Sequence, residues 1–285
     1  MSMTRSTLPI PICGPISSTM WIPRHRERGS MASAGDRKGT QSIERVVSLL
    51  REVASRPKVG WRLGDLAARC HLGRSTAHRL LACLVRERMV VQRSRDRHYF
   101  PGPMLFELGL AVSDYGELQR AARGRLAALA KRFGGCSAFL HFRSGDDFVC
   151  AARAGIEPKA TTIFPGTRLP LVLSAGGVAI LLALPVPEAR AIIRRNYEAL
   201  LDASRARRKA IREMLYRTHA EGIAVNAGYL TPGMNGFGLA LRDPAGMPVA
   251  AIVIVGPERV LPIENLPSIR HSLQSTAEEL QGYLD

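Results

Sequence analysis

The sequence predicts an α+β protein in two parts: a small helical domain that ends in a β-hairpin, and a larger domain built on an antiparallel sheet. Apolar residues recur at helical spacing through residues 41–87, and two short β-prone runs follow within residues 89–101. From Cys136 onward, strands, helices and further strands come in separate blocks. This grouping favours an α+β architecture over an alternating parallel fold.

Length and charge narrow the classes of partner. The 285 residues are enough for two ordinary domains, and 46% apolar with 22% charged residues is typical of a globular chain. Half of the net charge of +16 lies in residues 41–100, which hold 13 Lys or Arg against 5 Asp or Glu. Such a concentrated excess favours a polyanion, with nucleic acid first and an anionic membrane surface second. A general preference for arginine is the alternative, because only 5 of the 40 basic residues are lysine.

Cysteine usage and hydropathy argue against several other classes. An odd number of cysteines without C-x-x-C spacing disfavours a disulfide framework and a zinc site; they are Cys13, Cys70, Cys83, Cys136 and Cys150. We therefore expect neither a metal nor a cofactor. No apolar run reaches the roughly 18 residues that span a bilayer, and the proline-broken N-terminus is a poor secretory signal. These features predict a cytoplasmic protein with no membrane partner.

The first forty residues differ from the rest. They contain Pro9, Pro11, Pro15 and Pro23 and show no apolar period. We expect residues 1–40 to be a disordered extension, with Met31 as an alternative start of the natural chain.

Residues 41–102 have the element order of a winged helix-turn-helix. Ser42 can cap a first helix, whose apolar residues follow helical spacing; they are Ile43, Val46, Val47, Leu50 and Val53 or Ala54. "LGDLAARC" predicts a second helix, "HLG" a tight turn and "RSTAHRLLACLVRE" a third helix. "MVVQR" and "RHYF" then predict a hairpin around Ser94-Arg95-Asp96. Helix, helix, turn, helix and hairpin is the winged helix-turn-helix order.

The rest of the chain divides into a connector and a larger domain. Residues 103–133 predict a connecting helix with a weak point near Gly116. A hairpin follows, turning at Gly145-Asp146, and then a small-residue helix, "LSAGGVAILLALP", and two more helices. "GIAVNAG", "FGLALRD" and "PVAAIVIVG" predict strands, and a last helix closes the chain.

The third predicted helix has one apolar and one basic face. Ala77, Leu80, Leu81 and Leu84 form the apolar stripe, and Ala82 lies opposite them, among hydroxyl and arginine side chains. Hydroxyls, arginines and free N–H groups at a helix start suit phosphates and base edges. The predicted DNA contacts are Arg74, Ser75, Thr76, Arg79 and Arg86 on this helix, and Arg93, Arg95 and Arg97 around the hairpin tip. A solvated helix face and a solvated turn are the alternatives.

Within this set, the residues are expected to differ in role. We expect Arg79 to read a base edge, and Arg74 and Arg86 to contact phosphates. His78 and His98 are expected to pack rather than to bind a ligand, since no second metal-type residue lies at useful spacing.

Two sets of motifs together resemble one protein family. "STAHRLL" is followed by a run with Gly102, Pro103, Leu105, Glu107, Leu108 and Gly109, and "LPLVLSAGGVAILLALP", "RTHAEGIAVN" and "PVAAIVIVGP" come later. From about Gln41 to the last helix, the chain resembles the IclR family of bacterial transcriptional regulators. The resemblance implies double-stranded DNA with a near-palindromic operator as partner, and a GAF-like effector-binding domain at residues 134–285. It also implies a homodimer or a dimer of dimers.

The resemblance further implies a small-molecule pocket between the small-residue helix and the strands. Its positions here are Ser174, Ala175, Gly176, Gly177, Asn226, Gly236, Val253 and Val255. This chain departs from the family pattern: Val178 replaces a lysine, Asn226 an acidic residue, Gly236 a cysteine, and both valines replace serines. These apolar walls favour an aromatic or other larger organic acid over a two- or three-carbon acid. The alternative is that the valines pack as strand core and any pocket lies elsewhere.

The alternative interpretation is that the protein is an enzyme. "LSAGG" at Ser174 is not a G-x-S-x-G elbow, and no His or Asp is tied to it by spacing. We therefore expect no catalytic residues. A GAF-like domain with hydrolytic activity, or with thiol redox activity at Cys136 and Cys150, remains the alternative function.

Overall fold

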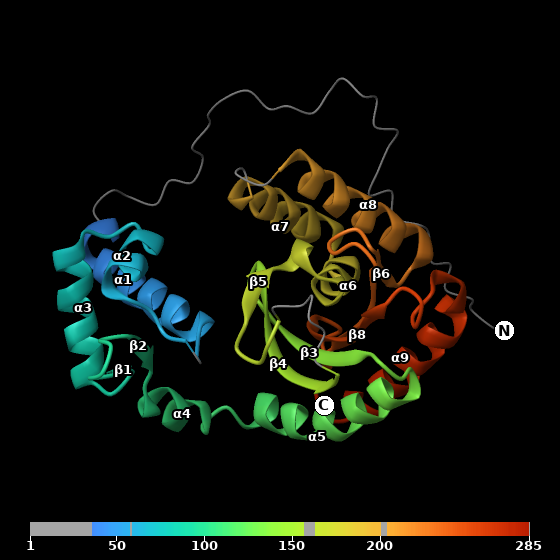
Figure 1. Ribbon diagram of the computed structural model, residues 1–285, viewed down its shortest axis with the longest axis horizontal. Coiled ribbons are helices and arrows are strands. Elements are labelled where there is room, and N and C mark those ends of the chain that lie inside the picture. Colours follow the sequence, from blue (N-terminus) through green and yellow to red (C-terminus); the bar gives the residue numbers. More distant parts are fainter. Residues whose placement is uncertain (1–35, 58, 157–162, 201–203, 285) are drawn as a thin grey trace.

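The computed structural model describes residues 36–57, 59–156, 163–200 and 204–284, and most of the predicted extension, residues 1–35, lies outside this range. Two connecting helices join a small N-terminal domain to a larger domain built on a sheet (Figure 1). The predicted mixed α+β fold class is confirmed. No helix within the described ranges is long and apolar enough to cross a membrane.

The N-terminal domain is a helical trio with a two-stranded wing. Its elements are α1 (Asp36–Ser55), α2 (Leu63–Arg69), α3 (Arg74–Arg86), β1 (Val90–Gln92) and β2 (Tyr99–Pro101). The buried side chains that unite the helices and the wing are Leu49, Val53, Leu66, Leu81, Leu84, Val90 and Tyr99. Trp61 adds a short antiparallel bridge to Tyr99, which fixes the wing to the segment before α2.

Helix α1 differs from the prediction at its start and in its buried face. It includes residues 36–40, which the sequence assigns to a disordered extension. Ile43 is 64% exposed and Val47 is 38% exposed, whereas Leu49 is fully buried. The apolar residues of α1 therefore form a band wider than the neighbouring helices can cover, and its outer edge faces solvent.

The connector is two helices rather than the single one predicted. Helix α4 (Pro103–Gly109) ends seven residues before Gly116, and α5 (Ser113–Arg132) contains Gly116 in its first turn. The break lies at residues 110–112, where the Val112 N–H group donates to Gly109 O over 3.2 Å in a tightened last turn. Gly109 favours the end of a helix, whereas a single glycine inside a helix costs only about 1 kcal/mol.

The turn between the wing and α4 explains the G-P-x-L-x-E-L-G motif. A Cβ on Gly102 would lie 2.1 Å from Arg88 O, so any side chain would collide with the backbone after α3. The Gly102 N–H group donates to Met89 O over 2.8 Å. Glu107 pairs with Arg88 over 2.6 Å and attaches α4 to the same turn. The motif therefore joins the connector to the winged helix.

The C-terminal domain is built on one six-stranded sheet. Its strands are β3 (Ser137–Ser144), β4 (Asp147–Gly155), β5 (Arg168–Pro170), β6 (Ala224–Ala227), β7 (Met234–Arg242) and β8 (Pro248–Pro257). They lie in the order β5-β4-β3-β8-β7-β6, and every neighbouring pair is antiparallel. The predicted hairpin and the three later strands are confirmed, while the three-residue edge strand β5 is an addition.

Helices cover both faces of this sheet (Figure 1). Helices α5 and α9 (Leu266–Gln281) pack on one face. Helices α6 (Ala175–Ala183), α7 (Val186–Ala199) and α8 (Arg205–Glu221) pack on the other face. Two single-turn segments, Leu171–Leu173 and Ile263–Asn265, precede α6 and α9. Each face has its own buried cluster, so the sheet separates two cores.

Candidate nucleic-acid interface and effector site

Helix α3 presents a basic surface because its apolar stripe is used by the domain core. Ala77, Leu81 and Leu84 are buried. The predicted contacts on the opposite side reach solvent: Arg74, Ser75, Arg79 and Arg86 are exposed and Thr76 is half-buried. The expectation that His78 packs rather than makes a contact is not met, because His78 is exposed beside Arg74 and Arg79. It lies one turn after Arg74, at the edge of the basic face.

The start of α3 suits an anion. Its N-cap is Gly73, which offers no side chain to the first N–H groups, and no acidic residue lies in the first turn. A helix start leaves N–H groups without intrahelical acceptors and carries a partial positive charge. Arg74 and Arg79 add full charges, and no described carboxylate forms an ion pair with either. These features together suit a bound phosphate.

A groove runs between this helix start and the wing. It has a volume of about 470 Å³, and its lining residues come from the starts of α2 and α3 and from the wing: Arg62, Leu63, Gly64, Asp65, Arg74, His78, Gln92, Asp96, Arg97 and Tyr99. Three of these are arginines against two aspartates. The groove brings the predicted contacts Arg74 and Arg97 to one opening.

The three predicted wing arginines differ in their surroundings. Arg93 donates from Nε to Asp96 Oδ1 over 3.0 Å, and its guanidinium lies 4.5 Å from the centre of the Phe100 ring. The Arg93 guanidinium also holds the pKa of Asp96 well below its usual range. Arg95 and Arg97 are exposed, and no carboxylate in the described chain pairs with them. The structure thus gives Arg93 an internal role in the wing turn and leaves Arg95 and Arg97 open to a phosphate.

Arg86, at the end of α3, is intermediate between the paired Arg93 and the unpaired Arg95 and Arg97. It lies 3.2 Å from Glu87 in an ion pair, and its side chain remains 75% exposed. Such exposed pairs contribute about 0–1 kcal/mol, so a phosphate can replace the carboxylate at little cost.

In the C-terminal domain, the register brings the predicted effector residues together on the α6 face of the sheet. Asn226, Gly236 and Val255 are direct neighbours in one row across β6, β7 and β8. Val253 lies one row further along β8, opposite Gly238. The start of α6 lies over these rows, since a Cβ on Gly236 would be 3.7 Å from Ala175 Cβ.

Glycines allow the start of α6 to approach both the sheet, at Gly238, and the single-turn segment before it, at Gly177. A Cβ on Gly238 would lie 2.9 Å from Ala175 O, and one on Gly177 would lie 2.1 Å from Leu171 O. The Ser174 hydroxyl accepts a hydrogen bond from the Gly177 N–H group over 2.8 Å and caps the helix. Ser174 therefore has a structural partner, while Ala175 and Gly176 occupy the helix start that faces the strands.

The row at Gly236 is less tightly filled than the row at Gly238. A Cβ on Gly236 would make only ordinary contacts, at 3.4 Å from Val255 and 3.8 Å from Asn226 Cβ. The walls of the proposed effector site are therefore apolar, except for the side-chain amide of Asn226. That amide is engaged, because Asn226 Oδ1 accepts a hydrogen bond from the Leu230 N–H group over 3.1 Å.

One polar residue of this face was missed by the sequence reasoning. His141 on β3 is 1% exposed, stacks on Phe148 with ring centres 4.2 Å apart, and lies directly beneath α6. A Cβ on Gly176 would be 2.5 Å from His141 Nδ1. Burial lowers the pKa of His141 to about 3, so its imidazole is neutral. The available signal was a single histidine between the apolar residues of "AFLHF".

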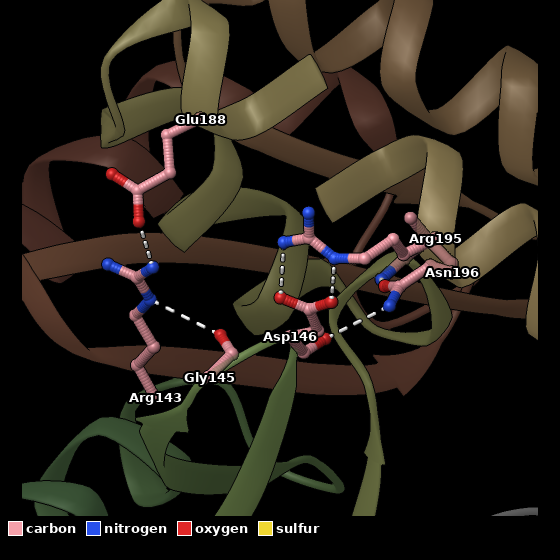
Figure 2. A network of polar contacts seen from close by, with 7 residues as sticks. Arg143, Gly145, Asp146, Glu188, Arg195 and Asn196 are labelled. Carbon is pink, nitrogen blue, oxygen red and sulfur yellow. Dashed lines mark hydrogen bonds and ion pairs between the residues drawn. The ribbon is translucent and has the colours of Figure 1, made fainter. Parts of the chain in front are cut away.

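A polar network holds the hairpin that carries His141 against α7 (Figure 2). Asp146, at the hairpin turn, forms a two-bond ion pair with Arg195, which lowers the pKa of Asp146. Arg143 pairs with Glu188. Buried Asn196 donates to Asp146 O over 3.1 Å and accepts from the Val172 N–H group over 3.3 Å. Asn196 therefore joins the hairpin to the segment that leads into α6.

The cysteines proposed as a redox pair lie on opposite faces of the sheet. Cys136 packs in the core beneath α5 and α9, and Cys150 in the core beneath α6. Burial raises the pKa of the Cys136 thiol to about 11 and that of Cys150 to about 12. The alternative of thiol chemistry between them is therefore wrong, because the sheet separates two thiols that are both held protonated.

Two family models match this chain, one for each of its two domains. Residues 42–94 match the IclR helix-turn-helix domain, and residues 111–281 match the C-terminal domain of bacterial IclR transcriptional regulators. The HTH-type transcriptional regulator BhcR of Paracoccus denitrificans is 28% identical over 259 residues, which cover 90% of this chain and 92% of BhcR.

Solved structures agree with this assignment at the level of the fold. An IclR-family regulator from Brucella abortus has a TM-score of 0.69 at 20% identity, covering 90% of this chain and 97% of that one. An IclR homologue from Microbacterium hydrocarbonoxydans, complexed with 4-hydroxybenzoate, has a TM-score of 0.63 at 23% identity, covering 85% and 98%. The two family matches together span most of the sequence, and the chain belongs to the IclR family of bacterial transcriptional regulators.

Proposed function

We propose that this regulator binds a near-palindromic operator in the cytoplasm as a homodimer or dimer of dimers, and that an organic acid in the C-terminal domain changes its operator affinity. The observation that carries the proposal is the outer face of α3. This face combines an uncapped helix start with Arg74 and Arg79, which have no ion-pair partner in the described chain. Two copies would place α3 in successive major grooves, about 34 Å apart or a multiple of that distance.

Exposed apolar residues support assembly with a second copy. They gather in α1, in α4 and in the segment after α4: Ile43, Val47, Phe106, Leu108, Leu110 and Val112. Phe106 is 70% exposed and Leu110 is 66% exposed, and the two are one helical turn apart. Clustered large apolar side chains on a surface mark an interaction site. Helix α1 belongs to the DNA-binding domain and α4 adjoins it, so pairing there would set the spacing of the two α3 helices.

The effector class follows from the walls beneath α6. Val253 and Val255 supply apolar walls, and the start of α6 supplies N–H groups for an acid. An aromatic acid suits this combination better than glyoxylate or pyruvate. The 4-hydroxybenzoate bound by the Microbacterium homologue supports the same class. Binding would favour those arrangements of the two domains that fit, or fail to fit, the operator spacing.

Two assays test the proposal. Footprinting on DNA upstream of its own gene should protect two half-sites separated by about one helical turn or a multiple of it. Calorimetry should then show tighter binding of benzoates than of pyruvate. Protection of a single site without symmetry would contradict the paired geometry, and tighter binding of pyruvate would contradict the apolar effector site.

A further inference from the structure

One acidic residue lies in the turn of the wing, among the predicted phosphate contacts. The turn between β1 and β2 carries arginines at positions 93, 95 and 97 and a single carboxylate, Asp96. Asp96 and Arg97 both line the groove that opens towards Arg74 at the start of α3. A carboxylate in this place repels phosphates, so Asp96 would weaken DNA binding if it acted through its charge alone.

The contacts of Asp96 connect both sides of this turn. On the β1 side, Arg93 donates from Nε to Asp96 Oδ1 over 3.0 Å and from a terminal nitrogen to Oδ2. On the β2 side, the His98 N–H group donates to Asp96 Oδ1 over 3.3 Å, and His98 Nδ1 lies 2.9 Å from Oδ2. Charge-assisted bonds of this kind are stronger than those between neutral groups. The carboxylate therefore holds the two ends of the turn together.

The same turn keeps Arg97 in a strained backbone conformation. Its φ is +59°, in the left-handed region that glycine and asparagine adopt more readily than arginine. The Arg97 N–H group donates to Arg93 O over 2.8 Å, and the Gln92 side-chain amide donates to Arg97 O over 3.2 Å. Such a conformation persists only where the surroundings enforce it, and it is frequent at functional sites. The direction of the Arg97 side chain therefore depends on the contacts that close the turn.

We propose that Asp96 is a positioning residue for DNA binding. It holds the wing turn so that Arg95 and Arg97 reach phosphates, and this gain exceeds the repulsion from its own charge. Arg93 then acts through Asp96 rather than by touching DNA. The inference rests on the proposed DNA contacts of the wing, and it assigns a favourable role to an acidic residue in a basic surface.

A second carboxylate in the same groove shows what charge alone would do. Asp65, at the start of α2, also lines the groove, and its side chain is exposed. No ion pair joins Asp65 to an arginine or lysine among the described residues, in contrast to Asp96. Removal of Asp65 should therefore only reduce repulsion, which makes it the matched control.

The test measures binding of the full-length protein to a duplex of arbitrary sequence, about 30 base pairs long, by fluorescence anisotropy at several salt concentrations. Phosphate contacts contribute to every sequence, so this probe is sufficient. Asp96→Ala should lower the affinity about threefold or more and make the salt dependence shallower by about one unit, as for a lost phosphate contact. Asp65→Ala should raise the affinity by up to about twofold with an unchanged salt dependence.

Two further variants separate positioning from charge. Asp96→Asn keeps an acceptor oxygen for Arg93 and for the His98 N–H group, so its affinity should lie between those of wild type and Asp96→Ala. Repulsion alone would instead make both Asp96 variants bind more tightly than wild type. Arg93→Ala combined with Asp96→Ala should lose clearly less affinity than the sum of the two single losses, because the pair acts as a unit. Additive losses would mean that Arg93 contacts DNA directly.

The outcomes distinguish this inference from the proposed function. If Asp96→Ala binds more tightly while Arg95→Ala binds more weakly, the positioning role is wrong and the wing contacts stand. If Arg95→Ala and Asp96→Ala both bind as wild type does, the wing does not contact DNA, and both proposals for the wing are wrong. Asp96 lies outside the buried cluster of its domain, so these variants should keep a Tm close to that of wild type. If Asp96→Ala did not fold, Asp96→Asn against Asp65→Asn would give the same comparison.

Discussion

Arg79 and Arg95 are both exposed and without a carboxylate partner in the described residues, but they project from different elements. Arg79 lies in the middle of the outer face of α3, which would enter the major groove, and Arg95 lies at the turn of the wing. A base-edge contact discriminates between sequences, whereas a phosphate contact adds affinity to every sequence. Removing each arginine should therefore have a different effect on DNA binding.

We predict that Arg79→Ala lowers operator affinity and reduces the preference for operator over unrelated DNA by about 1–3 kcal/mol. Arg95→Ala should weaken both DNAs alike and make the salt dependence shallower by about one unit. Fluorescence anisotropy with both duplexes at several salt concentrations measures both effects. Wild-type affinity in both variants would contradict the placement of this interface.

His141 leads to a second prediction at the residue scale, on stability against pH. Its pKa is about 3 in the folded protein and 6.5 ordinarily, so the unfolded chain takes up a proton at a higher pH than the folded chain does. The stability associated with neutral His141 is complete above pH 6.5 and falls as the pH drops from 6.5 towards 3. The slope is about 1.4 kcal/mol per pH unit.

Urea unfolding at pH 6.5 and at pH 5 should show the wild type losing roughly 2 kcal/mol more than H141F, whose side chain does not titrate. Equal losses in the two proteins would mean that His141 is protonated without cost, and that its burial is not retained in solution. H271F, at an exposed histidine on α9, serves as the control.

At the scale of elements, the polar network around the β3–β4 turn connects this turn with the segment that leads into α6 and the proposed effector site. Asn196 is 3% exposed and connects the hairpin turn with Val172, just before α6. Arg195 pairs with the same turn, but its side chain is 49% exposed. A buried amide that satisfies backbone groups matters more for stability than an exposed ion pair.

Asn196→Ala should therefore cost about 1–3 kcal/mol of the free energy of unfolding, because it leaves the buried Val172 N–H group without an acceptor. Arg195→Ala, one residue away, should cost about 1 kcal/mol or less. Chemical denaturation of both variants at neutral pH gives the comparison. If the two variants had the same free energy of unfolding, the network would not depend on the Asn196 amide.

Elements with a strong period could be predicted, whereas short elements and contacts across strands could not. The hairpin at Gly145 and the strands β7 and β8 were evident from alternation and turn residues. Edge strand β5 has three residues and too little pattern to be seen. The proximity of Asn226, Gly236 and Val255 was expected only through family resemblance, because cross-strand register is not written in the spacing along one chain. His141 was missed because an isolated histidine on an apolar strand is usually structural.

For the molecule as a whole, the two domains come close to each other at Gly166, in the β4–β5 connection, and the end of α1. A Cβ on Gly166 would lie 3.7 Å from Ala54 O and from Pro57 Cγ. The Gly166 N–H group donates to Cys150 O over 2.8 Å, and Cys150 is the strand partner of His141. A short series of contacts therefore connects the core beneath α6 with the DNA-binding domain.

Assembly is the other property of the whole molecule. Phe106→Glu and Leu110→Glu should shift the protein towards monomer, since each places a charge in the exposed apolar surface of the connector. Tyr216→Glu, at a residue that is 68% exposed on α8, is the matched control. Light scattering after size-exclusion chromatography reports the mass. An unchanged mass in both connector variants would place the interface elsewhere.

The central claim is that one chain joins operator binding by α3 and the wing to recognition of an organic acid beneath α6. The most direct measurement is operator affinity by fluorescence anisotropy, with and without saturating 4-hydroxybenzoate. We predict that the ligand changes the dissociation constant for the operator by about fivefold or more, as in ordinary allosteric coupling. An operator affinity that is the same with and without the ligand in wild type would contradict the account.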